Sequence, residues 1–393
     1  MPLKIGRGAA APAFMVMDVI TAANERQARL PPGTPRIIRM EVGQPGTGAP
    51  AGAVAAVLAA LNAGLPLGYT EALGRASLRS RLAQHYLEWY GAAVEPARIA
   101  VTVGASGAFP LAFLAAFDVG DRVAMASPFY PPYVNILQSL GMVPVILEAG
   151  PETRFQPTIA MLEALYPRPD GLIVASPCNP AGTMMRSHEL AEIAGWCHVH
   201  GVRLISDEIY HGVHYDEPIA TAATFPGAIV VNSFSKYYSM TGWRIGWMVL
   251  PADLIRPVER LAQNMFISVP HISQIAAEAA LDCGSELDLN VQAYRRSRSL
   301  LTAALAQAGF GEVAPLEGAF YLYVDVSSRT TDSRALCRWL LEEAGIAASP
   351  GLDFDRTRGD RFIRFSYCGA ETDMAAAAER LMALGEFPQA PGD

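Results

Sequence analysis

The chain of 393 residues is 51% apolar and 17% charged, a composition typical of a globular protein with a large core and little disorder. Its formal net charge of −8 at pH 7 argues against nucleic acid as a main partner, since phosphate binding requires dense positive charge. Five scattered cysteines without a CxxC pair predict reduced thiols, and the N-terminus lacks the apolar core of a signal peptide, so a cytoplasmic location is expected.

The N-terminal part of the chain predicts helices and one short strand. Residues 14–29 have helical spacing, the segment PPGTP after them predicts a turn, and residues 36–42 predict a strand. The uncharged run that follows contains a helical pattern at residues 50–61, which is shorter than the roughly 20 residues that a bilayer requires. We therefore expect a packed helix there and no membrane partner, followed by an amphipathic helix at residues 71–90.

From about residue 98 the chain alternates between apolar strands and helical segments. Strands that are apolar along their whole length, separated by helices, are typical of a mostly parallel sheet covered on both faces, which predicts an α/β fold. The predicted strands are residues 98–104, 121–128, 143–149, 171–177, 202–208, 228–235 and 243–250, and the predicted helices are residues 106–117, 133–141, 158–166 and 187–201.

The C-terminal part has a different pattern, which predicts a smaller α+β domain. Its elements are a long helix from about residue 271 into residues 287–309, strands at residues 320–326 and 361–367, and a helix near residues 332–344. We predict a large domain at residues 46–285, a small domain at residues 286–393, and an N-terminal segment, residues 1–45, that joins the small domain.

Polar loops follow five of the predicted strands. Parallel sheets bind ligands beyond the carboxyl ends of their strands, so these loops should meet at one edge. They have the sequences GASGAF, PFYPPY, PCNPAG, DEIY and SFSK. Five polar loops at equivalent strand ends are a stronger signal than any one motif.

Lys236 is one of only two lysines in the chain, the other being Lys4 near the N-terminus. Arginine supplies positive charge equally well, but it cannot lose a proton near neutral pH and attack a carbonyl carbon. A lysine kept between Ser235 and Arg244 therefore indicates covalent chemistry rather than an ordinary surface side chain.

The segment GASGAF opens a predicted helix, whose unpaired N–H groups favour an anion. An ordinary helix cap would explain Ala105 and Ser106 as well. Together with Ser233, Ser235 and Arg244, however, these residues could form a phosphate site.

Five further polar residues each allow two interpretations. Asp207 either caps a turn or meets a cation in a pocket, and Asn179 could belong to a turn. Tyr130 could pack in the core, Tyr210 could lie on the surface, and Arg364 either has an anionic partner or is exposed. The histidine pairs lack a third ligand at a suitable spacing, so no metal site is expected.

Taken together, these motifs resemble those of the class I/II aminotransferases, fold-type I enzymes that use pyridoxal 5′-phosphate (PLP). The family patterns SxSK, GxRxG, NPxG, DxxY, YTxxxG and RxS stand at residues 233–236, 242–246, 179–182, 207–210, 69–74 and 364–366. Their order and spacing hold from about residue 41 to residue 370. The resemblance implies a fold-type I architecture with a seven-stranded type of sheet.

The resemblance also implies a role for each residue around the PLP ring. Lys236 would hold PLP as a Schiff base and, once freed, would shuttle a proton. Asp207 would pair with the pyridine nitrogen, and Asn179 and Tyr210 would bind the phenolic oxygen of the ring. Tyr130 occupies the position whose side chain stacks on the ring.

Further implied roles concern the phosphate, the substrate and the assembly. The phosphate would be bound by Ala105, Ser106, Ser233, Ser235 and Arg244. Tyr69 would reach the phosphate of the neighbouring subunit, in a homodimer with shared active sites. Arg364, helped by Gly43, would bind the α-carboxylate of the substrate.

The expected activity is transfer of an amino group from an L-amino acid to a 2-oxo acid by a ping-pong mechanism. A PLP-dependent lyase or decarboxylase is an alternative, because pocket geometry decides which bond breaks. A non-catalytic regulator is a second alternative, although no basic stretch suggests an added DNA-binding domain. Phe14 and Met15 precede or begin the first helix and predict a less polar pocket, and no arginine is evident for a second substrate carboxylate.

Overall fold

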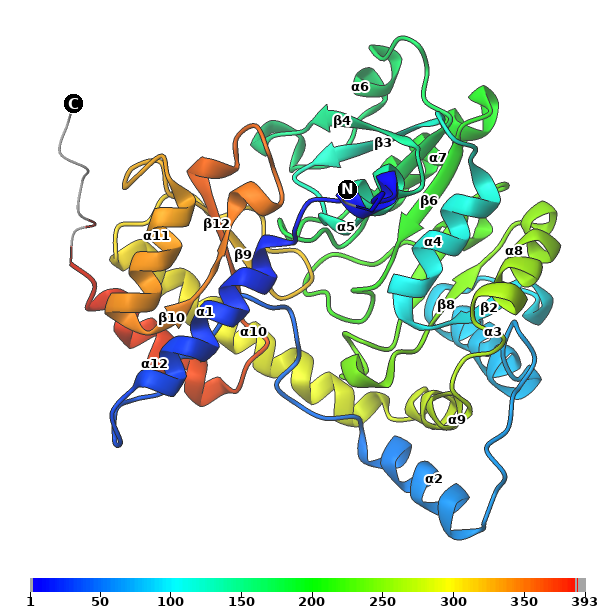
Figure 1. Cartoon of the computed structure of the whole chain (residues 1–393), viewed down its shortest axis with the longest axis horizontal. Coiled ribbons are helices and arrows are strands. Elements are labelled where there is room, and N and C mark those ends of the chain that lie inside the picture. Colours follow the sequence, from blue (N-terminus) through cyan, green and yellow to red (C-terminus); the bar gives the residue numbers. More distant parts are fainter. Residues whose placement is uncertain (1–2, 386, 388–393) are drawn as a thin grey trace.

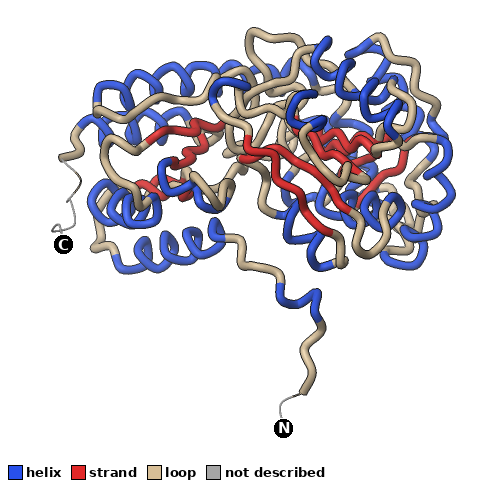
Figure 2. The backbone as a smooth tube through the Cα atoms, turned by 90° about the horizontal axis from the view of Figure 1, so that it is seen from above, coloured by secondary structure: helices blue, strands red, loops and turns tan. Residues whose placement is uncertain are grey.

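The computed structural model describes residues 3–385 and residue 387, and its strands form two separate groups flanked by helices (Figures 1 and 2). The larger group is a seven-stranded sheet within residues 99–249, in the order β2-β8-β7-β6-β5-β3-β4. β8 runs antiparallel to β2 and β7, and the other neighbouring strands are parallel. The predicted α/β fold with a mostly parallel sheet is confirmed. The strands are β2 (Ile99–Thr102), β3 (Arg122–Ser127), β4 (Val143–Glu148), β5 (Gly171–Ala175), β6 (Arg203–Asp207), β7 (Ile229–Ser233) and β8 (Gly246–Val249).

Helices cover the large sheet on both faces because its inner strands are apolar along their length. Val123 and Met125 of β3 point into a core shared with α4, α5 and α8, whereas Ala124 between them points into a core shared with α3, α6 and α7. These helices are α3 (Ala76–Tyr90), α4 (Gly104–Ala116), α5 (Pro132–Ser139), α6 (Ile159–Glu163), α7 (Ser187–His200) and α8 (Ala252–Met265).

The smaller group of strands combines both ends of the chain. β11, β12 and β9 form an antiparallel sheet, and β1 pairs in parallel with β10. Helix α1 packs against β10 and β11, and α10 packs along α12 (Figure 1). The elements are α1 (Met15–Arg29), β1 (Ile38–Arg39), α10 (Gly284–Gln307), β9 (Tyr321–Asp325), α11 (Ser333–Trp339), β10 (Ile346–Ala347), β11 (Ser349–Pro350), β12 (Phe362–Ser366) and α12 (Glu371–Met382). The domain boundaries at residues 45 and 285 stay a prediction, and residues 1–2, 386 and 388–393 of the outer segments lie outside the described part.

Several helices differ from their predicted extents, and α6, for example, ends at Glu163 rather than at residue 166. The long helix expected from residue 271 is broken at residues 281–283, where Asp282 is a poor helix former, and a second helix begins at Gly284. Helix α3 begins at Ala76 rather than at residue 71, because Gly74 adopts a φ of +91° in the turn before it. The helix expected near residues 332–344 is α-helical from Ser333 to Trp339 and continues as a π-helix from Leu340 to Ala344, so it differs from the prediction in the type of its last turn.

The uncharged run contains α2 (Ala51–Asn62), which packs against α9 (His271–Ala280) away from the large sheet (Figure 1). Within the described ranges, no helix combines the length and the apolar content that crossing a membrane would require.

Candidate active site

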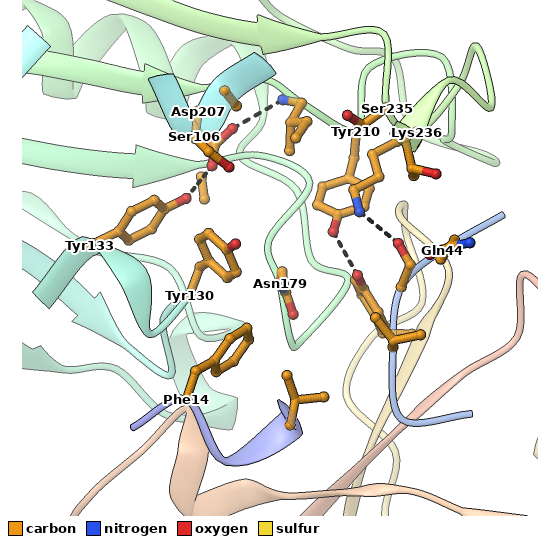
Figure 3. A pocket seen from close by; sticks show the side chains of 18 of the residues that line it. Phe14, Gln44, Ser106, Tyr130, Tyr133, Asn179, Asp207, Tyr210, Ser235 and Lys236 are labelled. Atoms are coloured by element: carbon orange, nitrogen blue, oxygen red, sulfur yellow. Dashed lines mark hydrogen bonds between the residues drawn. The ribbon is translucent and has the colours of Figure 1, made fainter. Parts of the chain in front are cut away.

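A pocket of about 250 Å³ lies at the carboxyl ends of the parallel strands, and elements of the smaller strand group close it (Figure 3). Figure 3 shows Lys236 and Tyr210 on one side of this pocket and Tyr130 and Phe14 on another. Most of the predicted site residues line it together: Gly43, Ala105, Ser106, Tyr130, Asn179, Asp207, Tyr210, Ser235, Lys236, Arg244 and Arg364.

Lys236 is held in a short turn after β7. The turn is fixed on both sides, because the Phe234 N–H donates to the Ile245 carbonyl and the Ser239 N–H donates to the Lys236 carbonyl, each at 3.1 Å. The Lys236 Nζ donates to the Gly43 carbonyl at 2.6 Å. Burial lowers the pKa of Lys236 to about 8. About a tenth of the amine is then neutral at pH 7, the form that a nucleophile requires.

Asp207 ends β6 with only 5% of its surface exposed. The Tyr133 hydroxyl donates to its Oδ2, and the Ile209 N–H donates to its Oδ1 at 3.1 Å. Burial raises the pKa of Asp207 to about 6, against the opposing effect of these donors and of Lys236. The carboxylate is therefore ionised at neutral pH and suited to a cationic ring nitrogen.

The first turn of α4 and Arg244 form a candidate anion site. Gly104 has a φ of +65°, and a Cβ atom there would lie 2.7 Å from the Arg244 Nη2, so glycine permits this close approach. The same Nη2 donates to the Ser106 Oγ at 3.4 Å. The N–H groups of the helix start and the guanidinium thus converge on one wall of the pocket, beside Ser235.

Arg364 is a buried cation on β12, with 2% of its surface exposed and no ion pair to a carboxylate within the described residues. Its Nη1 donates to the Asn179 Oδ1 at 2.7 Å, and its Nη2 donates to the Glu41 carbonyl. Its Nε is buried without a hydrogen-bond partner in the described part of the chain. A buried guanidinium with an orphaned N–H is suited to a carboxylate ligand.

Two predicted cofactor residues lie outside the pocket wall. Tyr69 is 83% exposed in the loop after α2. Ser233 is buried behind Ser235, at 2.9 Å between the Oγ atoms, and donates to the Ile245 carbonyl at 3.1 Å. Ser233 therefore does not line the pocket itself, but contacts Ser235, which does.

The outer wall is formed by Phe14, Val16 and Met17, while Met15, which the sequence analysis placed there, is absent from the described lining. Phe14 and Met17 are three residues apart and therefore share one side of the first turn of α1.

Tyr133 and Tyr321 are candidate functional residues that the sequence analysis missed. Tyr133 donates to Asp207, and the Tyr321 hydroxyl oxygen lies 2.6 Å from that of Tyr210. The partners are 74 and 111 residues apart in the chain. The only signal was the repetition of tyrosine in PFYPPY and FYLYVDV, which is equally typical of core packing.

The chain matches the family model for aminotransferase class I and II over residues 35–381. The chain belongs to this family. The predicted family and transaminase activity are therefore confirmed.

Several known aminotransferases are similar over almost their whole length. A valine–pyruvate aminotransferase from Mycobacterium tuberculosis is 47% identical, over 96% of this chain and 97% of the relative. The crystal structure of an aminotransferase from Mycobacterium tuberculosis superposes with a TM-score of 0.94 at 47% identity, covering 97% of this chain and 99% of that one. That of a putative aminotransferase from Silicibacter pomeroyi has a TM-score of 0.89 at 49% identity, with the same coverage.

In this aminotransferase the outer wall of the pocket is tied to the smaller strand group through Asp353. The Asp353 carboxylate accepts from the N–H groups of Met15 and Val16 at 3.1 and 3.0 Å and so caps α1. Burial raises the pKa of Asp353. The tie holds the Phe14 ring edge-to-face against Tyr130, at 6.0 Å between ring centroids.

Proposed function

We propose that this aminotransferase binds PLP and uses it to move an amino group from an apolar L-amino acid to a small 2-oxo acid by a ping-pong mechanism. When bound, PLP supplies an aldehyde that condenses with amines and a ring that withdraws electrons from the substrate α-carbon. The observation that supports this most is that three groups surround one pocket: Lys236, whose pKa is lowered, the Asp207 carboxylate, and the anion site beside Arg244.

The residues present fit each part of PLP. The cradle left by Gly104 between α4 and Arg244 suits the phosphate, and Asp207 suits the pyridine nitrogen. Tyr130 offers an aromatic face and Tyr210 a phenol hydroxyl. Lys236 points into the same pocket and supplies the amine for covalent attachment.

During turnover the chain's own groups bind, orient and move protons. Arg364 would fix the α-carboxylate of the substrate through its Nη and Nε atoms, with Asn179 orienting the guanidinium. The Lys236 Nζ, once free, would take the proton from the substrate α-carbon and deliver it elsewhere on the same face. Phe14 and Tyr130 would shield this transfer from water.

Capture of PLP by Lys236 should depend on pH with a midpoint near 8. The rate of attachment to the cofactor-free protein should rise with pH, reach half its maximum near pH 8 and level off above about pH 9, because the amine must lose its proton. The rate is followed by absorbance, and borohydride reduction with peptide mass mapping should place the pyridoxyl group on Lys236. The reaction of PLP with butylamine, measured over the same range, accounts for titration of PLP itself. A rate that keeps rising to pH 10, or an adduct elsewhere, would contradict the proposal.

The pocket chemistry favours an uncharged substrate side chain. The charged residues lining the pocket are Asp207, Lys236, Arg244 and Arg364, and the proposal already assigns each of them a partner. The apolar part of the wall left for a side chain is made of Phe14, Val16 and Met17, and the uncharged residues Gln44 and Thr241 also line the pocket. The valine–pyruvate activity of the similar mycobacterial protein supports the same substrate class.

Leucine should therefore be a better amino donor than aspartate, which is close to it in shape but charged. We expect kcat/KM with pyruvate to be at least about 10²-fold higher for leucine, because an unpaired carboxylate would be buried against the apolar wall. A donor panel that includes valine and asparagine measures this. Equal use of leucine and aspartate would rule out the apolar substrate class.

We also propose a homodimer in which Tyr69 reaches the phosphate site of the partner subunit. The loop that holds Tyr69 and the preceding helix α2 expose an apolar surface comprising Leu58, Leu61, Leu65 and Leu67. Such a patch on a projecting element is typical of an interface between subunits. Sedimentation equilibrium should give twice the 42.0 kDa chain mass, and a monomer would exclude this assembly.

We also propose a cytoplasmic location, because all five cysteines are free thiols and such thiols are typical of a reducing compartment. Cell fractionation of the natural host tests this directly.

A further inference from the structure

Tyr321 joins the substrate side of the pocket to the cofactor side. It is the first residue of β9 and is 1% exposed. Its hydroxyl oxygen lies 2.6 Å from the hydroxyl oxygen of Tyr210, which follows β6 of the large sheet. The interaction therefore connects the two strand groups at the pocket, and Figure 3 marks it with the dashed line from Tyr210.

Two neighbours fix the position of the Tyr321 ring and hydroxyl. The guanidinium carbon of Arg364 lies 4.4 Å from the ring centroid, a cation–π contact. A Cβ atom on Gly43 would lie only 1.7 Å from the Tyr321 hydroxyl oxygen, so a glycine at position 43 is required to admit the phenol. Such close packing leaves the hydroxyl little choice of partner, and Tyr210 is the partner it contacts.

The direction of the hydrogen bond follows from counting hydrogens. Each phenol has one hydrogen to donate and an oxygen that can accept. If Tyr210 donates its hydrogen to the phenolic oxygen of PLP, it has none left for Tyr321, and the 2.6 Å contact then requires Tyr321 to be the donor. A donor on the Tyr210 oxygen polarises the Tyr210 O–H bond and strengthens its own donation.

We propose that Tyr321 is a positioning residue, which donates its hydroxyl hydrogen to Tyr210 and thereby directs the single Tyr210 hydrogen at the phenolic oxygen of PLP. The inference rests on the proposed PLP function. It assigns Tyr321 a role in tuning the bound cofactor without direct contact with the reacting atoms. The charged and titratable groups facing the tyrosine pair from the surrounding elements are Asp207, Lys236, Arg364, Tyr130 and Cys368.

Tyr321→Phe should raise the pH midpoint of the absorbance change of the PLP-loaded enzyme. Without the Tyr321 hydroxyl, Tyr210 is a weaker donor and stabilises the anionic ring oxygen of PLP less. The bound cofactor therefore loses its proton at a higher pH. We expect an upward shift of about 0.5–1 pH unit, the size of one neutral hydrogen bond. Tyr210→Phe should shift the midpoint further in the same direction, and adding Tyr321→Phe to it should shift the midpoint no more.

Tyr323→Phe is the matched control, because Tyr323 lies two residues along the same strand and its buried hydroxyl has no hydrogen-bond partner within the described chain. Its midpoint should equal that of the natural enzyme. An unchanged midpoint in Tyr321→Phe, or an equal shift in the presence and absence of the Tyr210 hydroxyl, would overturn the proposal. If Tyr321→Phe does not fold, 3-fluorotyrosine at position 321 provides the test, since this stronger donor should lower the midpoint instead.

The test separates this inference from the proposed function. If no pyridoxyl group is found on Lys236 after borohydride reduction, the proposed function is refuted. If the group is found there but Tyr321→Phe leaves the pH midpoint unchanged, only the inference about Tyr321 is refuted. The four Tyr210 and Tyr321 combinations, unfolded without cofactor, should also show coupling in their free energies of unfolding, because the hydroxyl pair is buried. Additive effects there would contradict the hydrogen bond itself.

Discussion

Lys236→Ala should lower kcat for transamination by about 10⁴-fold or more, because it removes both the nucleophile and the proton-transfer group. The Nζ sits in the pocket with its pKa lowered by burial, and Arg244 and Arg364 are too basic to take over its acid–base role. Steady-state rates with the best donor, together with the rate of the first half-reaction, measure the loss. PLP should still be retained non-covalently at the anion site around Gly104, so that binding and chemistry can be distinguished.

The chain provides a matched control in its only other lysine. Lys4 is exposed in the N-terminal segment, and Lys4→Ala should leave kcat and cofactor attachment unchanged. Lys236→Arg should be as inactive as the alanine variant, since charge without a removable proton does not suffice. Activity within tenfold of the natural enzyme in either Lys236 variant would show that the covalent mechanism is wrong.

Arg364→Leu should lower kcat/KM by about 10²- to 10³-fold for every amino donor, since each donor carries the same α-carboxylate. The loss should appear mainly in KM, because the guanidinium binds substrate in the ground state and the transition state alike. Arg364→Lys should retain part of the affinity but lose the two-pronged geometry. A donor panel measured with both variants gives the comparison.

Arg361, three residues earlier and more than half exposed, is the control, and Arg361→Leu should leave KM unchanged. Arg364→Leu should change the stability of the free protein little, because removal of a buried charge without a carboxylate partner in the described structure offsets the loss of its hydrogen bonds to Asn179 and Glu41. A loss confined to one donor, or a fall in thermal stability that explains the lost activity, would argue against carboxylate binding.

The large sheet could be predicted because its strands have a strong local signal. Apolar runs such as GLIVA and the polar loops after them define both the strands and the edge where they end. The break between α9 and α10 could not be predicted with the same certainty. Both sides of residues 281–283 have helical patterns, and the separate packing of α9 on α2 and of α10 on α12 decides that two helices form.

The site divides in the same way. Lys236 and Asp207 are visible in the sequence because their residue types are unusual at the ends of apolar strands. Tyr133 and Tyr321 are not, because their importance lies in hydroxyl contacts to residues far along the chain. Tyr69 is the opposite case. Its motif predicts a contact with the phosphate of a neighbouring subunit, whereas in the single chain its side chain is exposed.

The position of the pocket between the two strand groups has a consequence for how the specificity for the amino donor could be changed. Lys236, Asp207 and Arg244 all belong to the large sheet and its loops, whereas Phe14 and Arg364 come from the chain's two ends. An engineer could therefore exchange the outer pieces to change the accepted amino acid while leaving the coenzyme machinery intact. Such an exchange would have to preserve the hydroxyl contact between Tyr210 and Tyr321, which connects the two strand groups.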